Sequence, residues 1–380
     1  MNYNEEALKL HEENKGKVAI SSKVKIETKD DLSTAYTPGV AEPCRKIYGN
    51  PEDVYKYTFK SKTVAVVTDG SAVLGLGDIG PEAALPVMEG KAVLFKRFAD
   101  IDAFPICLKT NNVDEIVSII KSIEPGFGGI NLEDISAPRC FEIEDRLKEE
   151  MNIPVMHDDQ HGTAVVVLAG LINACKLTNK NIKETKVVIS GAGAAGIAVA
   201  KILLNYDVKN LVLCDSKGIV SKNRNDLNEP KKEILTLTNP ENISGSLKDA
   251  LKDRDVFIGV SVKDIINTED IKTMKDPIVF AMSNPDPEII PDNAKAGGAK
   301  VIATGRSDFP NQINNVLAFP GIFKGALESG AKKITDEMKI AAAEALANHV
   351  KDLSPEKIIP NAFEDSVADV IAEAIKSNTH

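Results

Sequence analysis

Tryptophan is absent from this 380-residue chain, and aromatic residues make up only 5% of it. Cysteine is also scarce. The five cysteines are odd in number, widely spaced and nowhere form a C-x-x-C pair. Disulfide frameworks and thiolate zinc sites need paired or closely spaced cysteines, so the sequence argues against both. We therefore expect buried, reduced thiols and a reducing compartment. The cysteines are Cys44, Cys107, Cys140, Cys175 and Cys214.

A leader peptide, a long hydrophobic run and an excess of basic residues are missing too. Residues 1–17 are polar and mixed in charge, unlike a signal peptide. The longest apolar run, residues 163–175, is shorter than the about 20 residues that span a bilayer. The formal net charge of -10 repels polyanions, which disfavours nucleic acid and membranes as partners. We expect a cytoplasmic protein that acts on small metabolites.

Strand-like and helix-like segments alternate along the first half of the chain, which predicts a parallel α/β domain. A chain of this length exceeds one hydrophobic core, so a second domain is expected. We place the first domain at 1–160 and the second at 161–380. A helix and a short strand over residues 23–28 are predicted near the start, and amphipathic helices at the end. The main predicted strands are 63–70, 128–135, 210–215, 255–261, 277–285 and 300–305.

A glycine motif opens the second domain between a predicted strand and a predicted helix. Gly191, Gly193 and Gly196 stand in G-x-G-x-x-G register, with Ala192, Ala194 and Ala195 between them. This pattern is typical of a Rossmann-type, doubly wound parallel sheet that binds a dinucleotide at the helix N-terminus. Asp215 ends the next strand, where a carboxylate would bind a ribose 2′-hydroxyl and favour NAD. Lys217 and Lys222 lie nearby and leave NADP possible.

Acidic residues cluster in two predicted loops. Glu133 and Asp134 follow one strand, and Asp158 and Asp159 precede a long apolar run. Carboxylate oxygens suit Mg²⁺ or Mn²⁺, although acidic pairs are also common on ordinary surface loops. His157 and His161 are four residues apart and offer a zinc site as the alternative, but no H-E-x-x-H glutamate accompanies them.

Two further residues have reactive side chains in unusual surroundings. Lys91 lies among apolar neighbours, where burial would lower its pKa toward that of a general base. The ordinary alternative is a surface lysine whose stem packs on apolar neighbours. Tyr36 lies in a turn-rich stretch, and most tyrosines in such places only fill space and find one hydrogen-bond partner.

Eight segments, taken in order, resemble the malic enzymes, and most closely their compact prokaryotic form. The resemblance covers about residues 15–330. It implies oxidative decarboxylation of L-malate to pyruvate and CO₂, with NAD(P)⁺ and Mg²⁺ or Mn²⁺ as cofactors. The segments are AYTPGVAEPC, VVTDGSAVLGLGDIG, MEGKAVLF, NLEDIS, DDQHGTA, GAGAAG, FAMSNPDPE and NNVLAFPGIF.

The resemblance also implies roles for individual residues. Tyr36 corresponds to the general acid and Lys91 to the general base, which Asp158 would orient. His157 and His161 would then support the site without binding metal. The implied metal ligands are Glu133, Asp134 and Asp159, and the implied cofactor- and substrate-contacting residues are Asn284 and Asn315.

One position departs from the family pattern. Larger members carry a substrate-binding arginine before the ILGLGD segment, where this chain has Ala72. Candidates to replace it are Arg97, Lys46 and the backbone amides near Thr37 and Gly39. Segments that bind allosteric regulators in larger members are also missing, so simple kinetics are expected.

Two alternatives to the malic enzyme hypothesis stay open. A malolactic-type lyase would share these motifs, keep NAD bound and release lactate, although such proteins are expected to be longer. A non-catalytic NAD-binding protein would share the fold alone. We expect a homodimer or homotetramer in which the N-terminal region crosses to the neighbouring subunit.

Overall fold

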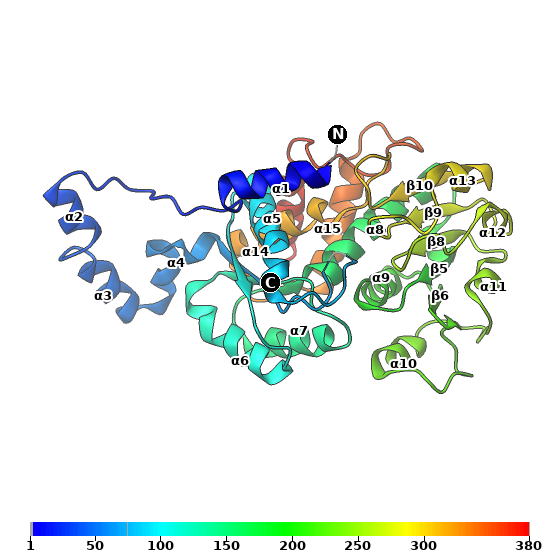
Figure 1. The fold of residues 1–380 in the computed structure, drawn as a ribbon, viewed down its shortest axis with the longest axis horizontal. Helices are drawn as coiled ribbons and strands as arrows, with labels where there is room; N and C mark the ends of the chain where they lie inside the picture. Colours follow the sequence, from blue (N-terminus) through cyan, green and yellow to red (C-terminus); the bar gives the residue numbers. More distant parts are fainter. Residues whose placement is uncertain (1–2, 74, 380) are drawn as a thin grey trace.

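Two parallel sheets, joined by one long helix, organise the chain (Figure 1). The computed structural model describes residues 3–73 and 75–379. The first sheet has the order β2-β1-β3-β4, and all of its pairs are parallel. Its strands are β1 (Thr63–Thr68), β2 (Asp102–Cys107), β3 (Gly129–Leu132) and β4 (Val155–His157). The crossover helices are α5 (Pro81–Ala99), α6 (Val113–Ile123) and α7 (Arg139–Glu150).

The second sheet has the order β10-β9-β8-β5-β6-β7. All of its pairs are parallel except β6 with β7, which is antiparallel. The strands are β5 (Lys186–Ser190), β6 (Asn210–Asp215), β7 (Gly218–Ile219), β8 (Val256–Gly259), β9 (Ile278–Ala281) and β10 (Val301–Thr304). The helices between them are α9 (Ala194–Asn205), α10 (Glu229–Leu235), α11 (Leu247–Leu251), α12 (Thr268–Lys272) and α13 (Pro291–Ala296).

The helix α8 (Asp158–Leu177) starts directly after β4 and packs against α9 of the second sheet. Three C-terminal helices cover the junction: α14 (Phe319–Ser329), α15 (Asp336–His349) and α16 (Val367–Ser377). The ring of Phe95 on α5 meets those of Phe319 and Phe323 on α14 at 4.7 and 5.4 Å. One apolar core therefore continues from the first half of the chain into the second. The predicted boundary at residue 160 falls within the first turn of α8 and stays a prediction.

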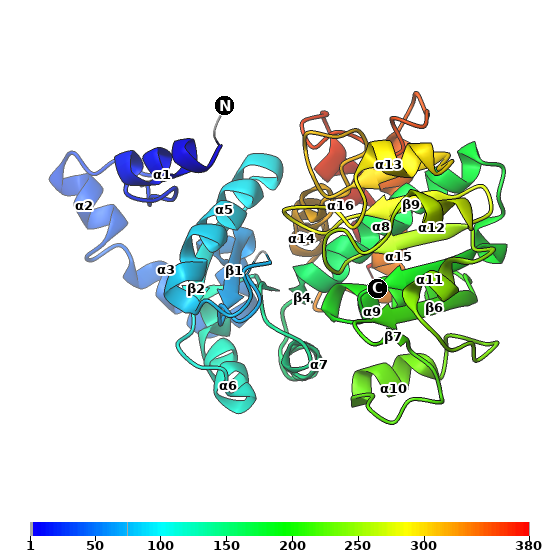
Figure 2. The ribbon, with the colours of Figure 1, turned by 45° about the vertical axis from the view of Figure 1, so that its right-hand side comes forward.

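The N-terminal helices lie on the outside of the molecule. Of these, α2 (Lys29–Ala35) and α3 (Ala41–Gly49) extend from the body as an arm, whereas the end of α1 lies beside α5 (Figures 1 and 2). None of these helices has a buried residue. The strand predicted at 23–28 is wrong, because this segment is extended but pairs with no described strand. Val24 and Ile26 are 61% and 55% exposed there. The helices are α1 (Tyr3–Asn14), α2 (Lys29–Ala35), α3 (Ala41–Gly49) and α4 (Val54–Tyr57).

The other strand predictions are confirmed, in β1, β3, β6, β8, β9 and β10. The prediction of buried cysteines is confirmed for Cys140, Cys175 and Cys214, whereas Cys107 is only partly buried and Cys44 on the arm is exposed. In the described part of the chain, no helix combines the length and apolar character needed to cross a membrane. Short 3-10 turns lie at Pro51–Asp53, Phe59–Lys62, Glu124–Gly126, Ile182–Glu184 and Asn315–Leu317.

Candidate active site

The loop between β5 and α9 carries the glycine motif, and each glycine has the surroundings that its role requires. Gly191 has a φ of 112°, and a Cβ there would lie 2.5 Å from the Val260 carbonyl oxygen. A Cβ on Gly196 would lie 1.7 Å from the Gly191 carbonyl oxygen, so only glycine lets α9 pack this closely. A Cβ on Gly193 would meet nothing within 4 Å. The backbone there is open to a pyrophosphate at the N-terminus of α9.

The same loop reaches the first domain. Ala194 begins α9 and packs against the apolar core beneath the first sheet. Ala192 is buried, and Ala195 follows Ala194 in the first turn of α9. A dinucleotide on this loop would therefore lie beside the first sheet.

Asp215 ends β6, as predicted, but its carboxylate is already engaged by cations. Arg224 Nη1 lies 2.7 Å from Oδ1 and Nη2 lies 3.1 Å from Oδ2, while Lys231 Nζ lies 2.6 Å from Oδ2. Burial opposes ionisation, but these hydrogen bonds hold the pKa of Asp215 at about 2. Lys217 contributes its backbone N–H at 2.9 Å, and its ammonium pairs with Asp226. The predicted phosphate-binding role of Lys217 and Lys222 has no direct support here. Arg224 and Lys231 are cations at this position that were not predicted from the sequence.

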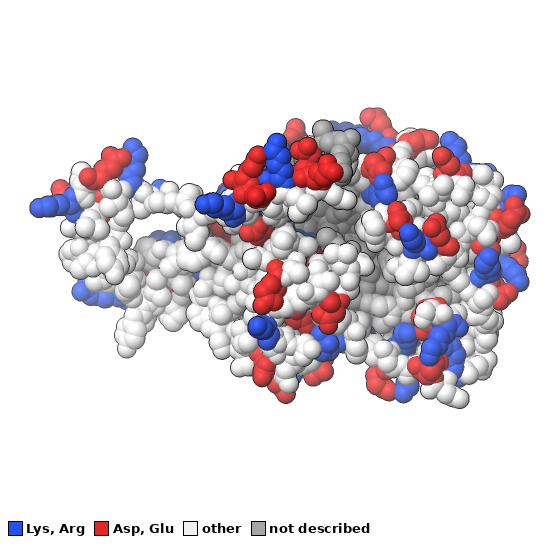
Figure 3. All heavy atoms as spheres, viewed as in Figure 1, with Lys and Arg blue, Asp and Glu red and all other residues white. Residues whose placement is uncertain are grey.

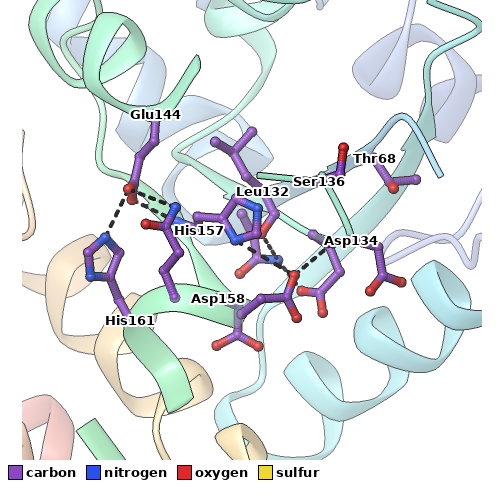
Figure 4. Close-up of polar contacts among 12 residues, drawn as sticks. Thr68, Leu132, Asp134, Ser136, Glu144, His157, Asp158 and His161 are labelled. Carbon is purple, nitrogen blue, oxygen red and sulfur yellow. Dashed lines mark hydrogen bonds and ion pairs between the residues drawn. The ribbon is translucent and has the colours of Figure 1, made fainter. Parts of the chain in front are cut away.

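Three carboxylates meet at the carboxyl ends of β3 and β4, and Figure 4 labels one of them, Asp134, near Asp158. Glu133 and Asp134 follow β3, and Asp159 lies in the first turn of α8. One ligand oxygen from each residue lies within 4.8 Å of those from the other two. Glu133 and Asp134 are buried, and the Asp134 N–H donates to Asp159 Oδ2 at 2.8 Å. The structure thus brings the three predicted metal ligands together.

The electrostatics of this cluster fit a divalent cation. Burial, only partly offset by Lys91 and reinforced by Asp159, raises the pKa of Glu133 well above its usual range. Buried carboxylates this close repel one another unless a cation neutralises them. An all-oxygen donor set suits Mg²⁺ or Mn²⁺.

Lys91 is buried and lies between two of the acids. Its Nζ is 2.6 Å from Asp158 Oδ2, 2.9 Å from Glu133 Oε1 and 4.4 Å from the ring centre of Phe319. Burial alone lowers the pKa of Lys91, but Asp158 and Glu133 outweigh it and raise that pKa above its ordinary value. The predicted lowering of the Lys91 pKa is therefore wrong, because that prediction considered burial alone and not the nearby carboxylates. The expected pairing of Lys91 with Asp158 is present.

Of the two predicted asparagines, Asn315 lies beside this cluster. A Cβ on Gly162 of α8 would lie 1.9 Å from Asp158 Oδ1 and 3.0 Å from the Cβ of Asn315. Asn315 therefore packs against the first turns of α8, next to the carboxylate that holds Lys91. A Cβ on Gly75 would lie 2.8 Å from the Asn284 carbonyl oxygen, so the glycine-rich loop after β1 contacts the loop after β9.

Tyr36 is a predicted catalytic residue, but within this single chain it does not lie near Lys91 and the acid cluster. It is the C-cap of α2 and is 66% exposed. Helix α2 lies on the arm, far from α8 in both ribbon views (Figures 1 and 2). Lys46, Thr37 and Gly39 lie on the same arm. The Gly39 N–H already donates to the Ser33 carbonyl.

The remaining candidate for the missing substrate arginine also lies elsewhere. Arg97 is six residues, about 9 Å, beyond Lys91 along α5. Its side chain lines a pocket with Phe98 and Phe363. A second arginine that the sequence reading missed, Arg139, donates to Asp69 Oδ2 at 2.9 Å and ties α7 to the loop that contains Ala72.

The histidines do not form a metal site. His161 Nε2 lies 2.9 Å from Glu144 Oε2, and its Nδ1 lies 3.2 Å from Lys339 Nζ, so both ring nitrogens have partners. His157 is fully buried, with Nδ1 3.6 Å from Asp159 Oδ2. The zinc alternative is therefore not supported, and the histidines take supporting positions. Glu144, which contacts both residues, was not predicted.

A dinucleotide loop that adjoins a buried lysine and three carboxylates of metal-binding type defines a dinucleotide-dependent oxidoreductase. Comparisons with known proteins identify the family. The model of the malic enzyme N-terminal domain matches residues 13–148, and that of the malic enzyme NAD binding domain matches residues 160–377. The chain belongs to the malic enzyme family, and it is an oxidoreductase of that family.

Named relatives agree with this assignment. The chain is 59% identical to the bifunctional malic/malolactic enzyme of Bacillus subtilis, over 99% of this chain and 92% of that protein. It is 57% identical to the NAD-dependent malic enzyme of Geobacillus stearothermophilus, over 95% and 76% of the two chains. The NADP-dependent malic enzyme of Escherichia coli is 45% identical, and the match covers 95% of this chain but 50% of that longer protein. A crystal structure of the NAD-dependent malic enzyme from Thermotoga maritima superimposes with a TM-score of 0.95 at 55% identity, covering 98% and 99%.

Proposed function

We propose that this protein catalyses the oxidative decarboxylation of L-malate to pyruvate and CO₂ with reduction of NAD(P)⁺. One observation carries the proposal: Lys91 is held by both Asp158 and Glu133, and Glu133 is also one of three acids grouped as metal ligands. A proton-transfer group and a cation site thus share one carboxylate, beside the dinucleotide loop. Retention of these groups also argues against a non-catalytic NAD-binding protein.

The first half-reaction is assigned to Lys91. Malate loses the proton of its C2 hydroxyl while a hydride leaves C2 for the nicotinamide. Lys91 is protonated while both carboxylates hold it, because they raise its pKa. It can accept the proton when Glu133 is engaged elsewhere, and Asp158 then remains to orient the amine.

Glu133, Asp134 and Asp159 would hold Mg²⁺ or Mn²⁺, which supplies Lewis-acid stabilisation of the negative charge that develops on loss of CO₂. Tyr36 is assigned the second half-reaction, in which its hydroxyl protonates the carbon that CO₂ has left. Asn284 and Asn315 are assigned contacts with cofactor and substrate.

Because Tyr36 lies on the arm, we propose that the active form is a homodimer, or a homotetramer built from such dimers, in which the arm reaches the neighbouring subunit. Uncovered apolar side chains on the arm support this arrangement, since a lone arm would leave them in water. They include Ile20, which is 90% exposed, and Tyr48, which is 92% exposed. The space-filling view shows the arm clear of the body (Figure 3).

We propose NAD as the preferred cofactor, with NADP accepted. Asp215 stands where a ribose hydroxyl would bind, which favours NAD. Arg224 and Lys231 neutralise that carboxylate, so its repulsion of a 2′-phosphate is reduced. The cytoplasmic location stays a prediction.

A malolactic-type lyase is the second candidate. Length was the reason to disfavour it, but the bifunctional malic/malolactic relative matches this chain over 92% of its own length, which removes that reason. Incubation of the protein with L-malate, Mn²⁺ and NAD⁺ separates the two activities. Oxidative decarboxylation yields NADH absorbance and pyruvate, whereas the lyase yields lactate without net NADH. Neither product in the wild type would refute both.

A further inference from the structure

Glu144 of α7 is a buried carboxylate outside the acid cluster, and the mechanism above does not use it. It is 2% exposed, although four of its neighbours on α7 are exposed acids. A buried carboxylate is tolerated when hydrogen bonds and a counter-charge surround it. Burial opposes its ionisation, yet His161 and Lys148 hold the pKa of Glu144 well below its usual range.

Glu144 has four hydrogen-bond partners around the β4–α8 junction, and Figure 4 shows two of them, His157 and His161, beside it. Oε1 accepts the His157 backbone N–H at 2.9 Å and Lys148 Nζ at 2.8 Å. Oε2 accepts His161 Nε2 at 2.9 Å and Gln160 Nε2 at 3.4 Å. Since a carboxylate offers about four acceptor positions, all of them are used.

The contacts of Glu144 lie on both sides of Asp158 and Asp159, the two acids of the site that begin α8. His157 is the N-cap of α8 and makes no side-chain cap of its own, so Glu144 supplies an acceptor that this helix end lacks. Asp158 and Asp159 follow His157 directly, and His161 completes the turn. Glu144 thus holds both ends of the turn that presents the Lys91 partner and a metal ligand.

The neighbouring helix α15 fixes the orientation of this contact. Lys339 Nζ lies 3.2 Å from His161 Nδ1, and an ammonium only donates. Nδ1 therefore accepts, and Nε2 donates to the Glu144 carboxylate at 2.9 Å. The Lys148 ammonium, 3.3 Å from the same Nε2, pairs with Glu144 Oε1 at 2.8 Å instead. With the Nε2 proton directed at Glu144, His161 keeps one acceptor, which Lys339 uses.

We propose that Glu144 is a positioning residue: it fixes the first turn of α8, and thereby places Asp158 against Lys91 and Asp159 against Glu133 and Asp134. The inference rests on the proposed function, because it concerns the metal site of that reaction. Glu144 is not among the grouped metal ligands, and it acts through the backbone of His157 and the side chain of His161.

Glu144→Gln tests the proposal, because it keeps the shape and one acceptor oxygen. The new amide must face His161 Nε2 or Lys148, both of which donate, so the arrangement cannot be satisfied. Binding of MnCl₂ alone, measured by electron paramagnetic resonance without substrate or nucleotide, reports the metal site directly. The Kd for Mn²⁺ is expected to rise roughly 10- to 100-fold, as for other residues that orient metal ligands. Glu149→Gln, on the exposed face of the same helix, should leave the Kd unchanged.

A merely structural role would lower the melting temperature of Glu144→Gln without changing the Kd of the folded variant, and that result would overturn the proposal. If this variant does not fold, Lys148→Met removes one half-exposed partner of Glu144 and should raise the Kd by a smaller factor. An unchanged Kd in Lys148→Met then overturns the proposal instead. Failure of the wild-type protein itself to bind Mn²⁺ would refute the proposed metal site and this inference with it.

Discussion

Gly162→Ala should disable the site although it adds a single methyl group to a helix. A Cβ at this position would lie 1.9 Å from Asp158 Oδ1. Ordinary van der Waals contact begins near 3.4 Å, so the carboxylate oxygen must move by about 1.5 Å. Asp158 is fully buried and holds Lys91 at 2.6 Å, so a movement of this size breaks that contact.

The cost to turnover follows from the geometry. Misplacing a reacting group by about 1 Å can lower the rate by roughly 100-fold. We expect kcat for malate oxidation to fall by about that factor in Gly162→Ala, measured as the rate of NADH formation with saturating malate, Mn²⁺ and NAD⁺. The nucleotide loop is not touched, so the Kd for NAD⁺ should stay at its wild-type value.

Gly170→Ala is the matched control on the same helix. A Cβ there would lie 3.3 Å from Ile313 Cδ1 and 3.4 Å from the Phe280 ring, which small adjustments of those side chains can accommodate. Alanine is the better helix former by about 1 kcal/mol, so this variant should remain stable and active. Wild-type kcat in Gly162→Ala would show that the contact between Lys91 and Asp158 does not matter for the reaction.

Three other predictions test the remaining parts of the account. Tyr36→Phe and Lys91→Ala should each be inactive. If Tyr36 acts across the dimer, mixing and reassociating the two variants should restore about a quarter of wild-type activity, because half of the dimers then contain one intact site of two. No recovery would place both residues in one subunit's site. Mn²⁺ at a hundred times its Kd should stabilise the protein by about 2.7 kcal/mol in a thermal-unfolding assay, and Glu133→Gln should abolish that gain; an equal gain in the variant would place the ion elsewhere. Arg224→Gln should lower kcat/KM with NADP⁺ about tenfold more than with NAD⁺, because a charge-assisted contact to the 2′-phosphate is lost; an unchanged ratio would exclude Arg224 from the cofactor site.

Much of the fold could be predicted because most strands are continuous β-branched runs that end in small or polar residues. Strands β2 and β4 were not predicted. β2 lies at the edge of its sheet and contains Pro105, which edge strands tolerate but which interrupts a strand pattern. β4 has only three residues, too few for a periodic signal.

The acid cluster could be predicted because acidic pairs at strand ends are a local feature, whereas the choice of Asp159 over Asp158 as a ligand came from the family resemblance. The pKa of Lys91 could not, because its sign depends on two carboxylates that are 42 and 67 residues away in the sequence. Glu144 was missed although a signal exists: it lies four residues after Cys140 and three before Leu147, on the buried face of α7. Its side chain could not be told from the exposed acids around it without the position of α8.

The role of Tyr36 could not be assessed from the structure of one chain. The sequence resemblance assigns it a catalytic role, but a single chain places it on an exposed arm. Residues that act between subunits leave no trace in the contacts of one subunit. Only the assembly can test that assignment.

The most direct test of the central claim is a crystal structure of the protein with Mn²⁺, in which anomalous scattering locates the ion. The account predicts one Mn²⁺ bound by carboxylate oxygens of Glu133, Asp134 and Asp159, with Glu133 turned from Lys91 toward the ion. An ion bound at another place, or none at a concentration that supports turnover, would contradict it.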